Sequence, residues 1–302
     1  MKISVIIPTQ NRQLDLKRAL RSVCSQTRQP DEIIVVDDAS EIPIDIKIAG
    51  EIECDIPLKV KRLNMSVRQG RARNIGANIA KGDILMFLDD DDTWEPTKVS
   101  DQLVIFEQEP DTGLVYSGRL VVNELDREKI VYRIKPQKSG YLYPDILYKN
   151  FIGSSSSVAI RKSIFKEVGC FEECMAWEDY ELWIRCCKKT IVKHDNCCNV
   201  RYTISNNYHK QSSRKSYNRH LEAVHILQEK YSYEINSQGL WNARKIYAER
   251  LFALAKSMRY QGLNHSLPWI LRSLWQFPKL KTIVLLLPPN MIQLTQSILH
   301  KE

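Results

Sequence analysis

The alternation of two hydrophobic periodicities over the first hundred residues constrains the fold of this chain most strongly. The run Ile3–Ile7 is continuously apolar, as in a strand that is buried on both faces. After it, apolar residues recur with the spacing of one helix face, namely Leu16, Ala19, Leu20 and Val23. Strands and helices that alternate with short loops predict a parallel sheet covered by helices.

Further segments continue this pattern. Glu32–Asp37 reads as a second buried strand, Leu58–Leu63 alternates like an edge strand, and Asp83–Leu88 is a third long strand. Residues 72–79 have helical spacing, and we expect that helix to end at Gly82 in a left-handed cap. The predicted fold class is therefore α/β, with a mostly parallel central sheet flanked by helices.

The rest of the chain is less regular and then becomes helical. Strands are expected near 114–122 and 156–160, and a helix near 178–187. From about residue 212 onward the spacing is helical. There is no internal repeat.

The positive charge of the chain is concentrated at its C-terminal end. Residues 209–302 contain fourteen Lys or Arg and five Glu, whereas the preceding residues sum to a charge of −1. This asymmetry suggests an anionic partner, either membrane lipid or nucleic acid, unless the region is only a solvated helical surface. Aromatic and basic side chains also flank a short apolar run here: Trp269, Arg272, Trp275, Phe277, Lys279, Lys281 and Ile283–Leu287. A helix lying in a membrane interface and a helix packed on the rest of the chain both fit this pattern.

No segment of the sequence reads as a targeting signal or as a membrane span. No signal peptide is visible, and Ile283–Leu287 is far shorter than the about 20 apolar residues of a spanning helix. We expect a cytoplasmic location, either free or peripheral on the inner face of the plasma membrane. The eight cysteines lack a Cys-x-x-Cys motif, so we expect reduced, buried thiols and no zinc site.

Polar segments follow three of the expected strands: Pro8–Arg12, Asp37–Ser40 and the acidic run Asp89–Asp92. Ligands of parallel α/β sheets bind beyond the carboxyl ends of the strands. Two carboxylates spaced Asp-x-Asp, as in Asp89 and Asp91, suit Mg²⁺ or Mn²⁺, and the ion would hold a diphosphate. The sequence therefore predicts a metal-assisted phosphate site at this edge.

Several motifs in order resemble glycosyltransferase family 2, over roughly residues 1–205. The matching segments are Ile6–Arg12, Val35–Ser40, Ala72–Gly76, Gly82–Asp83, Phe87–Asp92, Gly153–Glu173 and Trp177–Arg185. The resemblance implies a GT-A fold, with a nucleotide-sugar-binding half in residues 1–110 and an acceptor-binding half of the same catalytic domain in 111–208. The helical spacing and the charge of the remaining residues add a C-terminal helical extension, the basic helical region 209–302.

The activity implied by the resemblance is an inverting, metal-dependent transfer of one hexosyl or related sugar from a nucleotide-sugar to a hydroxyl acceptor. Bacterial-type surface glycans, such as exopolysaccharide, lipopolysaccharide or capsule, are the expected context. The Gln-x-x-Arg-Trp signature of processive members is absent, which argues against a polysaccharide synthase. Expected partners are a UDP-, GDP- or dTDP-sugar and a glycan or lipid-linked glycan, with no nucleic acid.

The resemblance also implies roles for individual residues. The nucleotide-sugar-binding residues would be Pro8, Thr9, Arg12, Asp38, Arg73, Asn74 and Asp90, and the ligands of Mn²⁺ or Mg²⁺ would be Asp89 and Asp91. A third metal ligand could be His209 or His194. Simpler roles compete with these: Arg73 as a surface arginine, Asn74 as a local cap, and Asp92 as a charge at a helix N-terminus.

Asp179 is the expected general base. If the segment from Asp179 to Cys187 is helical, Asp179 shares a face with Leu182, Trp183 and Cys186, where a carboxylate is unusual. In the resembled family this aspartate accepts the proton of the acceptor hydroxyl. A helix N-cap or a buried ion pair is the alternative role. Glu181 and Arg185, four residues apart, are expected to form an ordinary surface pair.

Two other functions compete with sugar transfer. A nucleic-acid-binding protein would use the basic C-terminal region and its aromatic residues, but it leaves the three polar strand ends unexplained. A nucleotidyltransferase also uses paired aspartates on a metal, and the helix carrying Glu178 and Asp179 favours sugar transfer over it.

Overall fold

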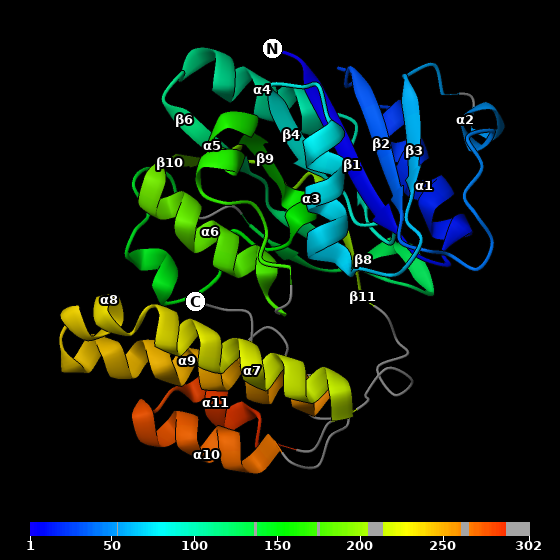
Figure 1. The fold of residues 1–302 in the computed structure, drawn as a ribbon. Coiled ribbons are helices and arrows are strands. Elements are labelled where there is room, and N and C mark those ends of the chain that lie inside the picture. The colour runs from blue at the N-terminus through cyan, green and yellow to red at the C-terminus, as the bar shows by residue number, and fades with distance from the viewer. Residues whose placement is uncertain (53, 136–137, 174–175, 205–213, 261–265, 288–302) are drawn as a thin grey trace. The chain divides into compact units, whose positions relative to one another are not determined.

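A computed structural model describes the chain except for residues 53, 136–137, 174–175, 205–213, 261–265 and 288–302 (Figure 1). The chain divides into two compact units. The first consists of Met1–Tyr143, Phe151–Cys174 and Glu178–Ile204, and the second of Pro144–Asn150, Met175–Trp177 and Ser205–Glu302.

The first unit is built on a seven-stranded sheet with the order β10-β6-β9-β4-β1-β2-β3. Its strands are β1 (Ile3–Thr9), β2 (Glu32–Asp37), β3 (Leu58–Arg62), β4 (Ile84–Phe87), β6 (Thr112–Tyr116), β9 (Val158–Arg161) and β10 (Ile191–His194). All neighbours are parallel except β9, which runs antiparallel to both β4 and β6. The predicted mostly parallel sheet is confirmed, and β3 lies at its edge as expected.

Helices cover both faces of this sheet, as β1 shows. Ile7 belongs to a core cluster with Leu20 of α1 (Gln13–Cys24) and Phe106 of α4 (Lys98–Gln108). On the opposite face, α3 (Gln69–Ile79) lies so close to β1 that a Cβ on Gly76 would stand 2.5 Å from a methyl group of Ile6. Alternate side chains of β1 therefore enter different layers, which is why its sequence is apolar throughout.

A second, smaller sheet and several short helices complete the first unit. The sheet has the order β5-β11-β7-β8. Its strands are β5 (Thr93–Trp94), β7 (Arg119–Asn123), β8 (Asp126–Ile134) and β11 (Val200–Ile204). The remaining helices are α2 (Ile48–Glu51), η2 (Ser155–Ser157), α5 (Lys162–Glu167) and α6 (Glu178–Lys189).

Two local expectations are wrong. Helix α3 ends at Ile79, and Gly82 is not a left-handed cap; a Cβ there would lie 2.6 Å from the backbone nitrogen of Ser4. Glycine is needed for this close approach of the backbone to β1. The expectation of reduced thiols is wrong for Cys24 and Cys54, which form a disulfide. It ties the end of α1 to the segment before β3, with Cα atoms 5.6 Å apart. A pairing across 30 residues leaves no spacing motif in the sequence.

The second unit is helical over its described residues. It contains η1 (Asp145–Leu147), α7 (Arg214–Lys230), α8 (Ser232–Ser237), α9 (Leu240–Tyr260), α10 (Leu267–Gln276) and α11 (Leu280–Val284). One core joins Phe252 and Ala255 of α9 to Ile270 of α10, and another joins Val224 of α7 to Leu254 of α9. Among the described residues, none of the helices is sufficiently long and apolar to cross a membrane.

Candidate active site

The structure brings the three polar strand ends together. Thr9 is the last residue of β1, and its carbonyl accepts a hydrogen bond of 2.8 Å from the backbone N–H of Asp38, which follows β2. The Thr9 hydroxyl donates to Oδ2 of Asp90 at 2.8 Å. Pro8 precedes Thr9 within the buried strand. Parallel strands that end at the same level thus place the predicted residues at one edge of the sheet.

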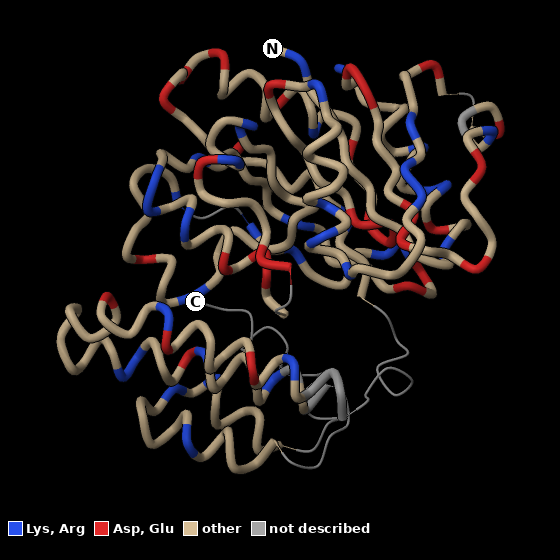
Figure 2. Tube along the Cα trace, viewed as in Figure 1, with Lys and Arg blue, Asp and Glu red and all other residues tan. Residues whose placement is uncertain are grey.

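Arg12 neutralises the middle of the acidic run. Its Nη1 lies 3.1 Å from Oδ1 of Asp90 and 2.8 Å from Oδ2 of Asp91. Burial raises the pKa of Asp90 to about 6, against the opposing influence of Arg12 and the Thr9 hydroxyl. Burial, and then the charge of Asp89, raise the pKa of Asp91 as well. Acidic and basic residues gather at this edge in Figure 2.

Arg73 joins the acidic run to the helix that carries the expected base. Its Nη2 lies 2.5 Å from Oδ1 of Asp89, and its Nη1 lies 2.9 Å from Oε1 of Glu178 on α6. The Arg73 side chain is only 3% exposed, so it is not a surface arginine. Burial by itself would lower the pKa of Arg73, but Asp89 and Glu178 raise it, and the side chain remains a cation.

Asp92 anchors the end of the acidic run. It is buried and accepts hydrogen bonds from the Ser156 hydroxyl at 2.6 Å and from the backbone N–H of Thr203 at 2.9 Å. Burial, followed by the charge of Asp91, holds the pKa of Asp92 well above its usual range. Ser156 also accepts the backbone N–H of Asp89 at 3.1 Å. No site role was predicted for Ser156, although its serine run lies in one of the matching motifs.

Asp38 supports the turn that leads into α3. Its carboxylate accepts hydrogen bonds from the Ser66 hydroxyl at 2.9 Å and from the backbone N–H groups of Val67 at 2.6 Å and Arg68 at 3.1 Å. Arg68 has a positive φ of 71°, which this carboxylate helps to hold. The expected contact of Asp38 with a base or ribose stays a prediction.

Asn74 connects α3 to the segment before α6. Its side-chain amide donates to the Phe171 carbonyl at 2.9 Å, and its side-chain oxygen accepts the Phe171 N–H at 3.0 Å. Both ends of the amide are therefore used within the protein. The proposed contact of Asn74 with a diphosphate stays a prediction.

Asp179 lies in the first turn of α6, next to Glu178. Burial and the neighbouring Glu178 carboxylate raise the pKa of Asp179 to about 7, while a 2.6 Å hydrogen bond from the Tyr180 N–H and the charge of Arg73 oppose the shift. A carboxylate with a pKa close to neutrality can accept a proton and release it under physiological conditions. The role of Asp179 as general base stays a prediction.

The expected surface pair of Glu181 and Arg185 on the same helix is wrong, because the Glu181 side chain is fully buried. Arg185 Nη2 lies 2.5 Å from Oε2 of Glu181. Arg185 also donates to the carbonyls of Val168 and Cys170. The pair thus fixes the chain that leads towards α6, and the i,i+4 spacing alone could not reveal its burial.

A divalent cation fits the chemistry of Asp89 and Asp91. Both offer hard oxygen donors, and the charge of Asp89 contributes to the raised pKa of Asp91, a repulsion that a cation relieves. The part of the chain that the structure describes has no group of three or more His, Cys, Asp or Glu able to hold a metal ion. A cation here therefore needs further oxygen ligands from a bound diphosphate or water. Residue His209 lies outside the described residues, and His194 is on β10, separated from β4 by two strands.

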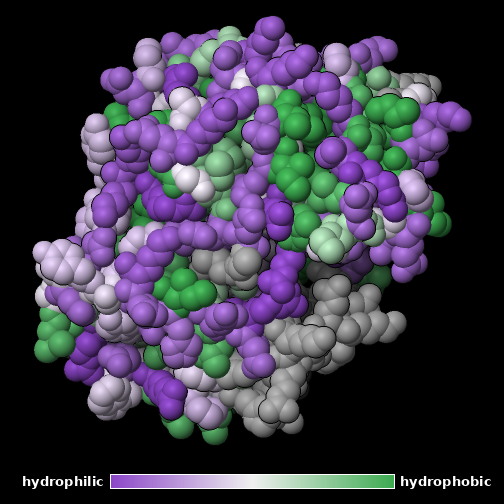
Figure 3. Space-filling view, viewed as in Figure 1, coloured by the Kyte–Doolittle hydropathy of each residue, from purple (hydrophilic) through white to green (hydrophobic). Residues whose placement is uncertain are grey.

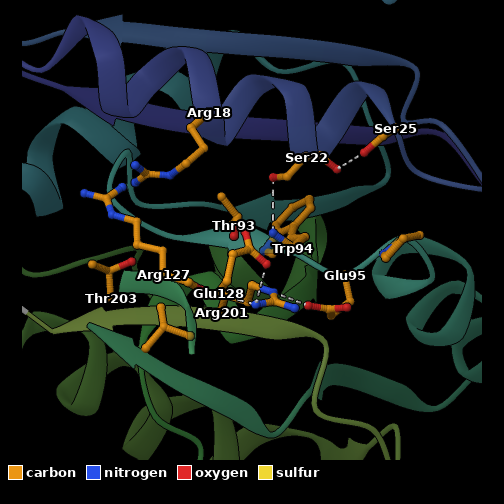
Figure 4. A pocket seen from close by; sticks show the side chains of 12 residues that line it. Arg18, Ser22, Ser25, Thr93, Trp94, Glu95, Arg127, Glu128, Arg201 and Thr203 are labelled. Carbon is orange, nitrogen blue, oxygen red and sulfur yellow. Dashed lines mark hydrogen bonds and ion pairs between the residues drawn. The ribbon is translucent and has the colours of Figure 1, made fainter. Parts of the chain in front are cut away.

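A polar cavity of about 290 Å³ lies between α1 and the smaller sheet, and Thr93 and Trp94, which follow the acidic run, line it (Figure 4). Arg18 donates to the Asp91 carbonyl at 3.1 Å, and the Thr203 hydroxyl donates to the same carbonyl at 2.6 Å. Arg18 and Arg127 both pair with Asp15, at 3.1 and 3.0 Å. Arg18 and Thr203, which line this cavity, thus support the backbone of the acidic run at Asp91.

Comparison with known proteins finds related sequences. The family model described as Glycosyl transferase family 2 matches residues 4–169. An uncharacterized glycosyltransferase of Haemophilus influenzae is 31% identical over 185 residues, which is 61% of this chain and 61% of that protein. The uncharacterized glycosyltransferase YwdF of Bacillus subtilis is 29% identical over 238 residues, covering 76% of this chain and 86% of its own length.

A solved structure supports the fold. The structure of S. aureus TarS 1–349 in complex with UDP-GlcNAc aligns with a TM-score of 0.64 and 21% identity, over 97% of this chain and 84% of that one. At this identity the similarity concerns the fold, and it confirms the GT-A architecture expected from the sequence.

Proposed function

Because this chain belongs to glycosyltransferase family 2, we propose that it transfers one sugar from a nucleotide-sugar donor to a hydroxyl group of an acceptor, with inversion at the anomeric carbon. The reaction would be non-processive. Asp179 would act as the general base, and the acidic run would stand at the diphosphate of the donor.

The proposed step is a single displacement. The Asp179 carboxylate accepts the proton of the acceptor hydroxyl, and the acceptor oxygen forms a bond to the anomeric carbon. The bond from that carbon to the diphosphate oxygen breaks, and its electron pair leaves with the nucleoside diphosphate. Attack opposite to the leaving group inverts the anomeric centre.

The bridge through Arg73 carries this proposal. A displacement of this kind needs a base on one side of the sugar and stabilised negative charge on the other. The Arg73 guanidinium, in contact with Asp89 and with Glu178, fixes the acidic run relative to the turn that holds Asp179. Helix α3, the acidic run and helix α6 thus meet at one buried cation.

The donor would bind at the carboxyl ends of β1 and β2. Thr9, Arg12, Asp38 and Asp90 are the residues that we propose to orient the nucleotide. Asp89 and Asp91 would hold Mn²⁺ or Mg²⁺, which when bound supplies positive charge to the departing diphosphate. Arg12 contacts Asp90 and Asp91, so it must adjust when a cation and diphosphate bind.

The acceptor that we propose is a glycan or a lipid-linked glycan of a bacterial-type cell surface. The protein would then act on the cytoplasmic side of the plasma membrane. Because a structure with the same fold was solved with UDP-GlcNAc, UDP-sugars are the first donors to test.

A donor screen tests this function. The protein is incubated with UDP-, GDP- and dTDP-sugars and Mn²⁺, and release of the nucleoside diphosphate is measured, with filter binding to DNA and RNA in parallel. We expect slow hydrolysis of one donor and no retention of nucleic acid. Retention of nucleic acid with no turnover of any donor would instead favour the nucleic-acid-binding alternative.

A further inference from the structure

Helix α10 in the second unit has an apolar outer face. Its inner face contains Ile270 and Ser273, which are buried, and the Ser273 hydroxyl donates to the Ala248 carbonyl of α9 at 2.8 Å. The outer stripe consists of three residues spaced four apart, Leu267, Leu271 and Trp275. Their exposed fractions are 50%, 53% and 74%. Helices of soluble domains normally present polar residues on this side. In Figure 3, hydrophobic residues reach the lower margin of the helical unit.

The first turns of α9 extend this apolar stripe with aromatic and basic residues. Trp241 is 61% exposed, and its ring centroid lies 5.1 Å from that of Phe277. Arg244 donates to the Trp275 carbonyl at 2.7 Å and lies over the Trp275 ring. Lys245 lies over the rings of Trp241 and Phe277. Arg272 follows Leu271 in α10, is exposed and lies over the Trp269 ring. The basic-aromatic face consists of Trp241, Arg244, Lys245, Leu267, Leu271, Arg272, Trp275 and Phe277.

The charge of this region has one sign. The only acidic residue in the sequence between Ile235 and Lys301 is Glu249. Its side chain is 8% exposed and is occupied by Lys279 and Lys281, each at 2.6 Å. The basic-aromatic face therefore combines exposed apolar groups with cations, and no carboxylate from this part of the sequence opposes them.

We propose that the basic-aromatic face docks on an anionic lipid surface. Leucine and tryptophan side chains suit the boundary between headgroups and acyl chains, and arginine and lysine suit anionic headgroups. A nucleic acid offers negative charge but no apolar layer for Leu267 and Leu271. Lipid docking by this face involves no residue of the candidate active site, so docking and sugar transfer can each fail without the other.

Vesicle flotation of the full chain tests the docking. We expect the protein to float with vesicles of phosphatidylcholine and phosphatidylglycerol, to float less at high salt, and to stay in solution with phosphatidylcholine alone. Arg272→Gln should weaken binding about fivefold, the usual contribution of one cation near an anionic surface. Leu271→Glu should weaken it at least about tenfold, because an apolar anchor is lost and a like charge is added.

The matched control is Leu125→Glu. Leu125 lies between β7 and β8 of the first unit and is 80% exposed. Leu125→Glu therefore makes the same substitution at an exposed leucine outside the basic-aromatic face. It should bind vesicles like the parent protein. Equal loss in both leucine variants, or recovery of the parent protein in the soluble fraction under every condition, would overturn the proposal.

Tryptophan fluorescence gives a second readout. Of the six tryptophans, Trp241 and Trp275 are exposed, and the other four are partly or fully buried. Lipids brominated near the headgroup should therefore quench the parent protein, and the double change Trp241→Phe with Trp275→Phe should remove most of the quenching while flotation persists. A dimer in lipid-free solution that Leu271→Glu dissociates would assign the face to a second copy and contradict the proposal.

Discussion

At the scale of single residues, four adjacent carboxylates are tolerated because their neighbours differ. Asp89 pairs with Arg73, Asp90 and Asp91 share Arg12, and Asp92 is buried among hydrogen-bond donors. Two cations from separate segments of the chain thus offset part of the repulsion, although burial still raises the pKa values of Asp90, Asp91 and Asp92.

Removing Arg73 should destabilise the protein and impair its activity. Arg73→Met leaves Asp89 and Glu178 without their shared cation, and we expect a loss of about 3 kcal/mol in the free energy of unfolding. Urea unfolding measures it. The control Arg71→Met removes an exposed arginine of the same helix, 3.5 Å from Glu173, and should change stability by less than about 0.5 kcal/mol. Equal effects of the two changes would contradict the bridging role.

The raised pKa of Asp179 predicts how activity depends on pH. The base works only when deprotonated, so kcat/KM should rise with pH through about 7 and then level off. Below that pH the carboxyl group is increasingly protonated and activity should fall. A profile recorded between mildly acidic and mildly basic pH tests this, and a constant rate across the range would be inconsistent with Asp179 as the titrating base.

At the scale of elements, the placement of α3 on the sheet depends on a glycine. A Cβ on Gly76 would stand 2.5 Å from Ile6 and 3.1 Å from Val36, so Gly76→Ala should push α3 away from β1 and cost about 1–3 kcal/mol of stability. A Cβ on Gly50 of α2 would have no other atom within 4 Å, and Gly50→Ala is the control. Thermal unfolding of both variants checks this, and a Gly76→Ala protein as stable as the parent would refute the close contact.

The alternation of strands and helices could be read from the sequence because each element carries its own periodicity. Contacts between distant elements could not. Arg73 and Glu178 are 105 residues apart, and no local pattern pairs them. The antiparallel insertion of β9 and the Cys24–Cys54 disulfide depend on the same kind of long-range packing, and the burial of Glu181 depends on what covers α6.

At the scale of the whole molecule, ligand binding should appear as stabilisation of the fold. Two carboxylates fill too few of the about six positions around Mg²⁺ or Mn²⁺, so the ion alone should bind weakly. Mn²⁺ together with the matching nucleoside diphosphate should raise the melting temperature by roughly 5 °C when the ligand is about a hundredfold above its Kd. Asp91→Asn should abolish this rise in melting temperature. An equal rise with Mn²⁺ alone would show that Mn²⁺ binds without the nucleoside diphosphate, contrary to this prediction.

Asp179 is the proposed base of a sugar transfer, and the donor is proposed to bind elsewhere in the site. The most direct measurement compares the parent protein with Asp179→Asn, recording kcat for nucleoside diphosphate release in the presence of an acceptor and donor affinity by calorimetry. We predict that kcat falls about a hundredfold or more while the donor Kd stays near that of the parent. Transfer by Asp179→Asn at the parent rate would contradict this role.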